Sequence, residues 1–300
     1  MAEPSDKAHA GMKQARFYEK DGDRLRCRLC PHLCAVGPGG TGLCGVRRNA
    51  GGVLYAESYG RFTSLALDPV EKKPLRRFHP GRRILSAGGY GCNMRCPYCQ
   101  NSDISQQIPD DSQDGRTETE YIPPEKMLAL ALAIEGNLGV AFTYNEPLIA
   151  VEYLLDTAPL LKENGLASVL VTNGLVNPGP LEELLPYIDA MNIDIKGFTP
   201  AFYGKLGGDL ETVKETVRLC AARCHVEVTT LVIPGENDGD GEMEALCGWL
   251  ASVSPELPLH LSRFFPRWRM TEREPTPVNT LRRLEGIAKE RLRHVYVGNV

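Results

Sequence analysis

The chain has 300 residues, of which 42% are hydrophobic, and this length permits one barrel-sized domain with a smaller module. Its net charge of −4 gives no overall reason to expect nucleic acid as a partner. The sequence contains no apolar run of about eighteen residues, which argues against a membrane span, and its polar start argues against a secretory signal. Ten cysteines without an export signal indicate reduced thiols, metal ligation and a cytoplasmic protein.

We predict a flexible or loosely docked arm over residues 1–25 and a cysteine- and glycine-rich module over residues 26–70. Cys27, Cys30, Cys34 and Cys44 follow a C-x2-C-x3-C-x9-C spacing, and His32 could replace one thiolate. Because large apolar residues are few here, we expect a metal to hold the module together. Four thiolates suit structural zinc, which we favour. They also suit an auxiliary iron–sulfur cluster, which would make the module an electron relay.

A basic connector is predicted over residues 71–83, followed by apolar runs that alternate with amphipathic stretches. This alternation is typical of repeated β-α units and a parallel sheet. The predicted strands are 84–88, 140–143, 168–172, 191–195, 226–232, 259–264 and a short last strand, 294–297. The predicted helices are 124–135, 147–164, 181–185, 210–222, 242–251 and 278–293, and 108–123 is predicted to be a surface loop. Six units predict an α/β fold, an incomplete (β/α)6 TIM-like barrel over residues 84–300.

The loop after the first of these strands contains the most informative motif. Cys92, Cys96 and Cys99 have the spacing C-x3-C-x2-C. Thiolates are the usual ligands of iron–sulfur clusters, and a four-iron cluster normally takes four of them. A loop with three thiolates therefore leaves one iron open to a small chelating molecule. The alternative is a zinc site with a distant fourth ligand, but zinc sites usually pair their cysteines as C-x2-C.

This motif resembles that of the radical S-adenosylmethionine (SAM) superfamily. The resemblance implies a [4Fe–4S] cluster whose open iron is chelated by the amine and carboxylate of SAM. Reductive cleavage then gives methionine and a 5′-deoxyadenosyl radical, which abstracts a hydrogen atom from a substrate. The cofactor performs the radical chemistry, and the protein positions it and excludes water. The resemblance also implies an electron donor such as flavodoxin or ferredoxin, and it places Tyr98 near the adenine of SAM.

In parallel β/α folds, functional groups gather at the carboxyl ends of the strands. A zwitterionic ligand with a ribose and an adenine needs oxygens for its ammonium, a cation for its carboxylate and a narrow apolar slot. The predicted SAM contacts at strand ends are Asn145, Glu146, Thr172, Asn173, Asp194, Lys196 and Ile233, and His260 and Arg263 are predicted on the substrate side.

Each of these residues also has a plainer interpretation. Glu146 could be an acidic residue at a helix start, and Thr172 and Asn173 precede a glycine in an ordinary turn sequence. Asp194 and Lys196 are two apart on a strand and should share a face, either towards a ligand or as a solvated pair. Single histidines are more often structural than catalytic.

Several segments together resemble the radical-SAM subunit family of the AmmeMemoRadiSam system, which is similar to pyruvate formate-lyase activating enzyme. The matching segments are 27–34, 42–47, 71–75, the Cys92 loop, 143–147, 194–197, 262–264 and 295–299. Glu146 matches the acidic residue of the activating enzymes' Gly-Gly-Glu motif, but its two glycines are absent here. The Cys92 loop and the strand-end residues argue against a non-enzymatic iron–sulfur electron-transfer or scaffold protein.

Two kinds of partner follow from this second resemblance. An activating enzyme would install a glycyl radical on a partner enzyme, whereas the AmmeMemoRadiSam family implies Memo-like neighbouring proteins and a small-molecule, peptide or RNA substrate. Basic residues mixed with aromatics over 263–273 suit an anionic substrate or single-stranded nucleic acid. Surface charge and packing explain them equally well, and the acidic net charge makes nucleic acid the less favoured partner.

Overall fold

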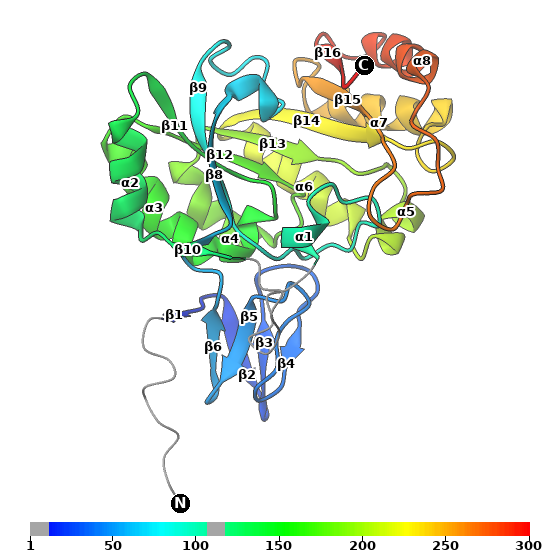
Figure 1. Ribbon diagram of the computed structural model, residues 1–300. Coiled ribbons are helices and arrows are strands. Elements are labelled where there is room, and N and C mark those ends of the chain that lie inside the picture. The colour runs from blue at the N-terminus through cyan, green and yellow to red at the C-terminus, as the bar shows by residue number, and fades with distance from the viewer. Residues whose placement is uncertain (1–11, 107–117) are drawn as a thin grey trace, which may run out of the picture.

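The computed structural model describes residues 12–106 and 118–300. A large α/β unit carries a small all-β module below it, next to α1 (Ser102–Ser105) and α4 (Pro178–Leu184) (Figure 1). The start of the expected arm (1–11) and most of the expected loop (108–123) lie outside the described residues. No helix in the described part of the chain has the length and hydropathy needed to cross a bilayer.

The α/β unit is built on one eight-stranded sheet with the order β16-β15-β14-β13-β12-β11-β9-β8. All neighbours from β9 to β16 pair in parallel, and β8 pairs antiparallel with β9. The strands are β8 Ser64–Pro69, β9 Arg83–Gly88, β11 Asn137–Thr143, β12 Ala167–Thr172, β13 Ala190–Asp194, β14 His225–Val232, β15 Leu259–Arg263 and β16 Val295–Gly298. The fold class predicted from the sequence is confirmed, and every predicted strand is present.

Most helices lie between successive strands, as the βαβ pattern requires. Pro124 and Pro147 start their segments, where a missing N–H costs nothing. The predicted helix 147–164 begins as a 3-10 turn, and the short helix α5 was not predicted. The remaining helices are α2 Pro124–Ala133, α3 Val151–Glu163, α5 Pro200–Lys205, α6 Leu210–Ala221, α7 Asp240–Val253 and α8 Val278–Lys289, with 3-10 turns at Val70–Lys72, Pro147–Ala150 and Leu185–Tyr187.

The N-terminal module contains two three-stranded sheets, with the orders β1-β6-β5 and β2-β3-β4. Its strands are β1 Lys13–Gln14, β2 Tyr18–Asp21, β3 Arg24–Cys27, β4 Ala35–Val36, β5 Arg47–Ala50 and β6 Val53–Ala56, and β7 Arg61–Phe62 pairs with β10 Glu120–Tyr121. The expectation of an arm is wrong for residues 13–25, because β1 pairs with β6 and β2 pairs with β3. The sheet of the large unit also begins earlier than predicted, at β8.

The apolar residues of the module do not form a separate core. Leu25, Leu29, Val36 and Leu54 are buried in the same continuous hydrophobic cluster as the residues of the large sheet. Packing against the α/β unit therefore supplies stability that we had expected metal alone to supply.

A buried ion pair joins the module to the α/β unit. Arg47 of β5 donates to both carboxylate oxygens of Glu152 in α3, at 2.7 and 3.1 Å, and both side chains are almost fully buried. Arg47 also donates to the backbone oxygens of Arg16 and Ile149. Because a buried charge is costly unless it is paired, this contact fixes how the two parts dock.

The predicted basic connector is anchored to the large sheet by several hydrogen bonds. Lys73 is buried and donates to Asp68 of β8 at 2.9 Å. The carbonyl of Pro74 accepts from Asn192 of β13 at 2.9 Å. The backbone N–H groups of Arg76 and Arg77 donate to the buried carboxylate of Glu227, near the amino end of β14. The segment thus packs into the sheet near the amino ends of its strands.

Candidate functional site

A cavity of about 420 Å³ lies at the carboxyl ends of the central strands, beside the Cys92 loop. Cys92, Cys96 and Cys99 all line it. The predicted SAM contacts that also line it are Tyr98, Asn145, Glu146, Thr172, Asn173, Asp194 and Lys196. The structure therefore brings most of the predicted site residues to one cavity.

The Cys92 loop is held in place by polar contacts to its sulfurs and by a close backbone approach. Cys92 Sγ lies 3.4 Å from the N–H of Met94 and 3.6 Å from Nδ2 of Asn173. A Cβ on Gly91 would come within 2.8 Å of the carbonyl oxygen of Cys44, and Gly91 has a φ of +82°. Only glycine suits both conditions, so the loop is pressed against the N-terminal module.

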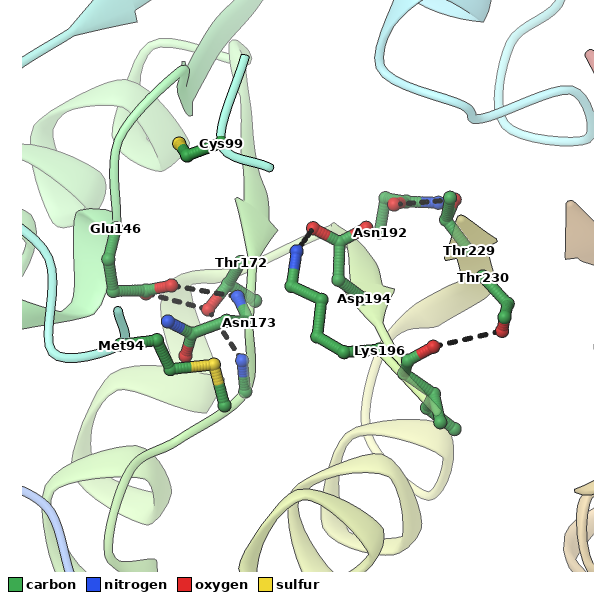
Figure 2. Close-up of polar contacts among 12 residues, drawn as sticks. Met94, Cys99, Glu146, Thr172, Asn173, Asn192, Asp194, Lys196, Thr229 and Thr230 are labelled. Carbon is green, nitrogen blue, oxygen red and sulfur yellow. Dashed lines mark hydrogen bonds and ion pairs between the residues drawn. The ribbon is translucent and has the colours of Figure 1, made fainter. Parts of the chain in front are cut away.

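Glu146 is buried beside the cavity and already accepts three hydrogen bonds. Oε1 accepts from the N–H of Leu148 at 2.9 Å. Oε1 also accepts from the hydroxyl of Thr172 at 2.7 Å, and Oε2 accepts from the N–H of Asn173 at 2.7 Å (Figure 2). Burial raises the pKa of Glu146 to about 7, against the effect of these donors. Glu146 therefore caps the 3-10 turn at Pro147, in agreement with the alternative prediction of an acidic residue at a helix start. It also lines the cavity.

Asn173 joins the strand ends to the Cys92 loop. Its Oδ1 accepts from the N–H of Leu175 at 2.8 Å, which forms the turn expected from the sequence. Its Nδ2 donates to Oδ1 of Asn93 at 2.9 Å and points towards Cys92. Sequence analysis did not identify Asn93 as a site residue, although its position between two cysteines could have indicated it.

Asp194 and Lys196 form an ion pair on the cavity wall, with Nζ 2.6 Å from Oδ2 (Figure 2). Their side chains are only 29% and 19% exposed. Burial disfavours the charged form of Lys196, but the attraction of Asp194 outweighs it and the pKa of Lys196 is raised. The pair presents both charges to one cavity, where a zwitterionic ligand would meet them.

Three predicted site residues do not line the cavity. Ile233 is buried, and its N–H donates to Oδ1 of Asn237 at 2.7 Å. Arg263 donates to the carbonyl of Thr276 at 2.8 Å and thereby holds the loop after β15.

The placement of His260 corrects its predicted role. Its Nε2 lies 2.6 Å from the buried carboxylate of Glu227. His260 sits two residues before Ser262 on β15, and Ser262 is the residue of that strand that lines the cavity. The strand was identified correctly, but the histidine lies one layer below the cavity. Glu227 was also missed, although a glutamate inside an apolar strand was a visible signal.

The lining of the cavity also includes residues that the sequence singled out only as part of a basic stretch. Lys72 and Lys73 line the cavity together with Tyr144. Lys73 Nζ lies 4.5 Å from the centre of the Tyr144 ring, whose hydroxyl donates to Asp68 at 2.8 Å. A cation over an aromatic ring is attracted by the π face, so this part of the lining is fixed before any ligand enters.

The N-terminal cysteines line a second, smaller pocket together with His32 and Arg47. The four are Cys27, Cys30, Cys34 and Cys44. Within the ranges 12–106 and 118–300, no group of three or more His, Cys, Asp or Glu side chains is placed to hold a single metal ion. Structural zinc therefore stays a prediction.

Comparison with known proteins agrees with this site. The profile of the Radical SAM superfamily matches residues 87–247, which include the Cys92 loop and both charges of the ion pair. The chain is 41% identical to the uncharacterized protein MJ0808 of Methanocaldococcus jannaschii over 96% of its own length and 86% of that protein. It is 31% identical to the pyruvate formate-lyase-activating enzyme of Clostridium pasteurianum over 49% of its own length and 63% of that enzyme.

Solved structures share the fold. A radical SAM methyltransferase from Sphaerobacter thermophilus aligns with a TM-score of 0.55 and 14% identity, over 74% of this chain and 67% of that one. SuiB of Streptococcus suis aligns with a TM-score of 0.51 and 12% identity, over 70% of this chain and 47% of that one. Because the family model matches more than half of the chain and includes the Cys92 loop, the chain belongs to the Radical SAM superfamily.

Proposed function

We propose that this protein binds a [4Fe–4S] cluster through Cys92, Cys96 and Cys99 and cleaves SAM reductively. The observation that carries the proposal is that three cysteines of one loop line one cavity together with the partly buried ion pair of Asp194 and Lys196. Three thiolates fit a four-iron cluster that keeps one iron open. Once reduced, such a cluster would supply the electron that breaks the sulfonium bond of SAM, and the 5′-deoxyadenosyl radical so formed would take a hydrogen atom from the substrate.

The chain's own residues bind and orient SAM in this proposal. Lys196 offers a cation to the carboxylate of SAM, and Asp194 offers acceptor oxygens to its hydroxyl or ammonium groups. Oε2 of Glu146 accepts one hydrogen bond from the protein, so it retains a lone pair for the SAM ammonium. Tyr98 is buried beside Cys96 and provides an apolar surface for the adenine. Because these groups are held by the fold before SAM binds, little ordering is required on binding.

We also propose which kind of molecule donates the hydrogen atom. A relative named as a pyruvate formate-lyase-activating enzyme supports a glycyl residue of a partner enzyme as the donor. A small molecule, a peptide or RNA modified together with Memo-like proteins is the alternative. The cavity lining extends from the cysteines to Lys72 and Ser262, and in this proposal the substrate group lies at the Lys72 and Ser262 end. Flavodoxin or ferredoxin is the proposed electron donor.

The experiment measures 5′-deoxyadenosine and methionine formed from SAM by anaerobically reconstituted protein with dithionite. Cys96→Ala is expected to abolish both products, because one of three cluster ligands is lost. Cys224→Ala removes a partly buried cysteine outside both cysteine sets and serves as the matched control. Undiminished 5′-deoxyadenosine formation by Cys96→Ala protein would contradict the proposal.

A further inference from the structure

The N-terminal module contains a second place where cysteine sulfurs converge. Cys27, Cys30, Cys34 and Cys44 come from separate turns of the chain and line one pocket. Two of them are buried and two are partly buried, so the pocket is largely closed to solvent. A single free cysteine often packs as a small hydrophobe, but four thiols that converge on one pocket are typical of metal ligation.

One sulfur of the pocket accepts a backbone hydrogen bond. The N–H of Leu43 donates to Cys34 Sγ at 3.5 Å. The same pattern is present at the proposed catalytic cluster, where the N–H of Met94 donates to Cys92 Sγ. N–H donors to sulfur stabilise metal-bound thiolates.

Arg47 places a cation in the pocket, and one of its side-chain nitrogens has no hydrogen-bond partner among the described residues. Its side chain is 1% exposed and lines the pocket, and its charge lies close to Cys27 and Cys44. The terminal nitrogens are bonded to Glu152 and to backbone oxygens, but Nε is buried without a hydrogen-bond partner among the described residues. A buried unpaired N–H costs about 1–3 kcal/mol. An anionic group in the pocket would offset that cost.

The arrangement of the sulfurs favours a cluster over a single ion. Tetrahedral zinc with Zn–S bonds of about 2.3 Å brings its thiolates within about 3.8 Å of one another. No set of cysteines in the described residues is gathered in this way. The cysteines of the Cys92 loop are likewise not gathered around a single ion, and at that loop the family implies a four-iron cluster. A cube of iron and sulfide holds its cysteines at its outer corners, farther apart than one ion does.

The second pocket lies directly against the Cys92 loop. His32 Nε2 lies 2.7 Å from the carbonyl oxygen of Asn93, the residue that follows Cys92. Arg95 of the loop donates to the carbonyl of Leu43 in the module. These two contacts join the N-terminal module to the Cys92 loop.

We propose that Cys27, Cys30, Cys34 and Cys44 hold a second [4Fe–4S] cluster, fully ligated by protein and adjacent to the one at the Cys92 loop. Having four thiolates, this cluster has no iron open to SAM, in contrast to the first. Arg47 balances part of its negative charge. The proposal stands on the N-terminal pocket and does not require that SAM be cleaved.

The test uses a full-length variant in which Cys92, Cys96 and Cys99 are all replaced by alanine, which leaves the N-terminal set intact. After anaerobic reconstitution with iron and sulfide, we expect about eight irons per chain in the unchanged protein and about four in the variant. The variant's reduced cluster should give an electron paramagnetic resonance (EPR) signal that SAM does not alter. In the unchanged protein, the signals of two neighbouring reduced clusters should broaden each other.

Two results would overturn the proposal. One is a triple variant that contains about one zinc and no iron when purified anaerobically from cells supplied with both metals. The other is a variant that holds no iron, while unchanged protein holds about four irons and forms 5′-deoxyadenosine. In the second case the proposed function stands and only the second cluster is rejected. Cys30→Ala in the triple variant is the further control, since it should remove the remaining iron signal.

Discussion

The buried carboxylate of Glu227 offers a quantitative test of how the basic segment is held against the sheet. It accepts from the N–H groups of Arg76 and Arg77 at 3.0 and 2.7 Å, and from Nε2 of His225 and His260 at 2.9 and 2.6 Å. Burial alone would raise the pKa of Glu227, but the two histidines and the two N–H groups outweigh burial and lower it from 4.5 to about 2.

This pKa shift corresponds to about 3 kcal/mol of folding free energy. Because the folded-state pKa of Glu227 is depressed, the contribution is complete above pH 4.5 and is lost as the pH falls towards 2. Glu227→Gln keeps the size of the side chain but turns an amide N–H₂ towards groups that donate. We expect the variant to lose about 3 kcal/mol at neutral pH, and the difference to shrink below pH 4.5.

Urea unfolding followed by tryptophan fluorescence measures the effect between pH 7 and pH 3. Glu285→Gln is the matched control, because hydrogen bonds from Lys289 and Arg282 also lower the pKa of Glu285. Both partners of Glu285 are more than half exposed, so the control should lose no more than about 1 kcal/mol. Equal losses in the two variants, or a difference that does not change below pH 4.5, would refute the reasoning.

Three further outcomes follow from the structure. Glu152→Gln leaves the buried charge of Arg47 without its partner and should cost about 3–5 kcal/mol in urea unfolding. Lys196→Met removes the cation that faces the cavity and should weaken SAM binding about 10- to 100-fold by equilibrium dialysis, with the melting temperature little changed. Gly139→Ala places a Cβ 1.9 Å from a backbone oxygen of β12 and should abolish soluble expression, whereas Gly248→Ala in α7, with no atom within 4 Å, should stabilise the protein by about 0.5–1 kcal/mol.

The strands of the large sheet were predictable because parallel strands buried on both faces form continuous apolar runs. The strands of the N-terminal module were not, since β1 and β2 are short and mostly polar, and their pairing partners lie elsewhere in the sequence. Strand ends predicted Glu146 and Asp194 at the cavity because the carboxyl ends of parallel strands meet at one edge.

The same rule failed for His260 for a simple geometric reason. A shift of two residues along a strand moves a side chain one layer along the same face, so His260 meets Glu227 below the cavity while Ser262 reaches it. Contacts such as Lys73 with Asp68 join a loop to an edge strand. Neither local propensity nor periodicity carries information about that kind of contact.

The central claim is that Cys92, Cys96 and Cys99 leave one iron open and that SAM binds there. The EPR spectrum of the reduced protein, recorded before and after SAM is added, tests this claim most directly. We predict that SAM shifts the g values of one cluster signal, and that this SAM-sensitive signal is missing in Cys96→Ala and present in Cys224→Ala. A spectrum that saturating SAM leaves unchanged in the unmutated protein would contradict the claim.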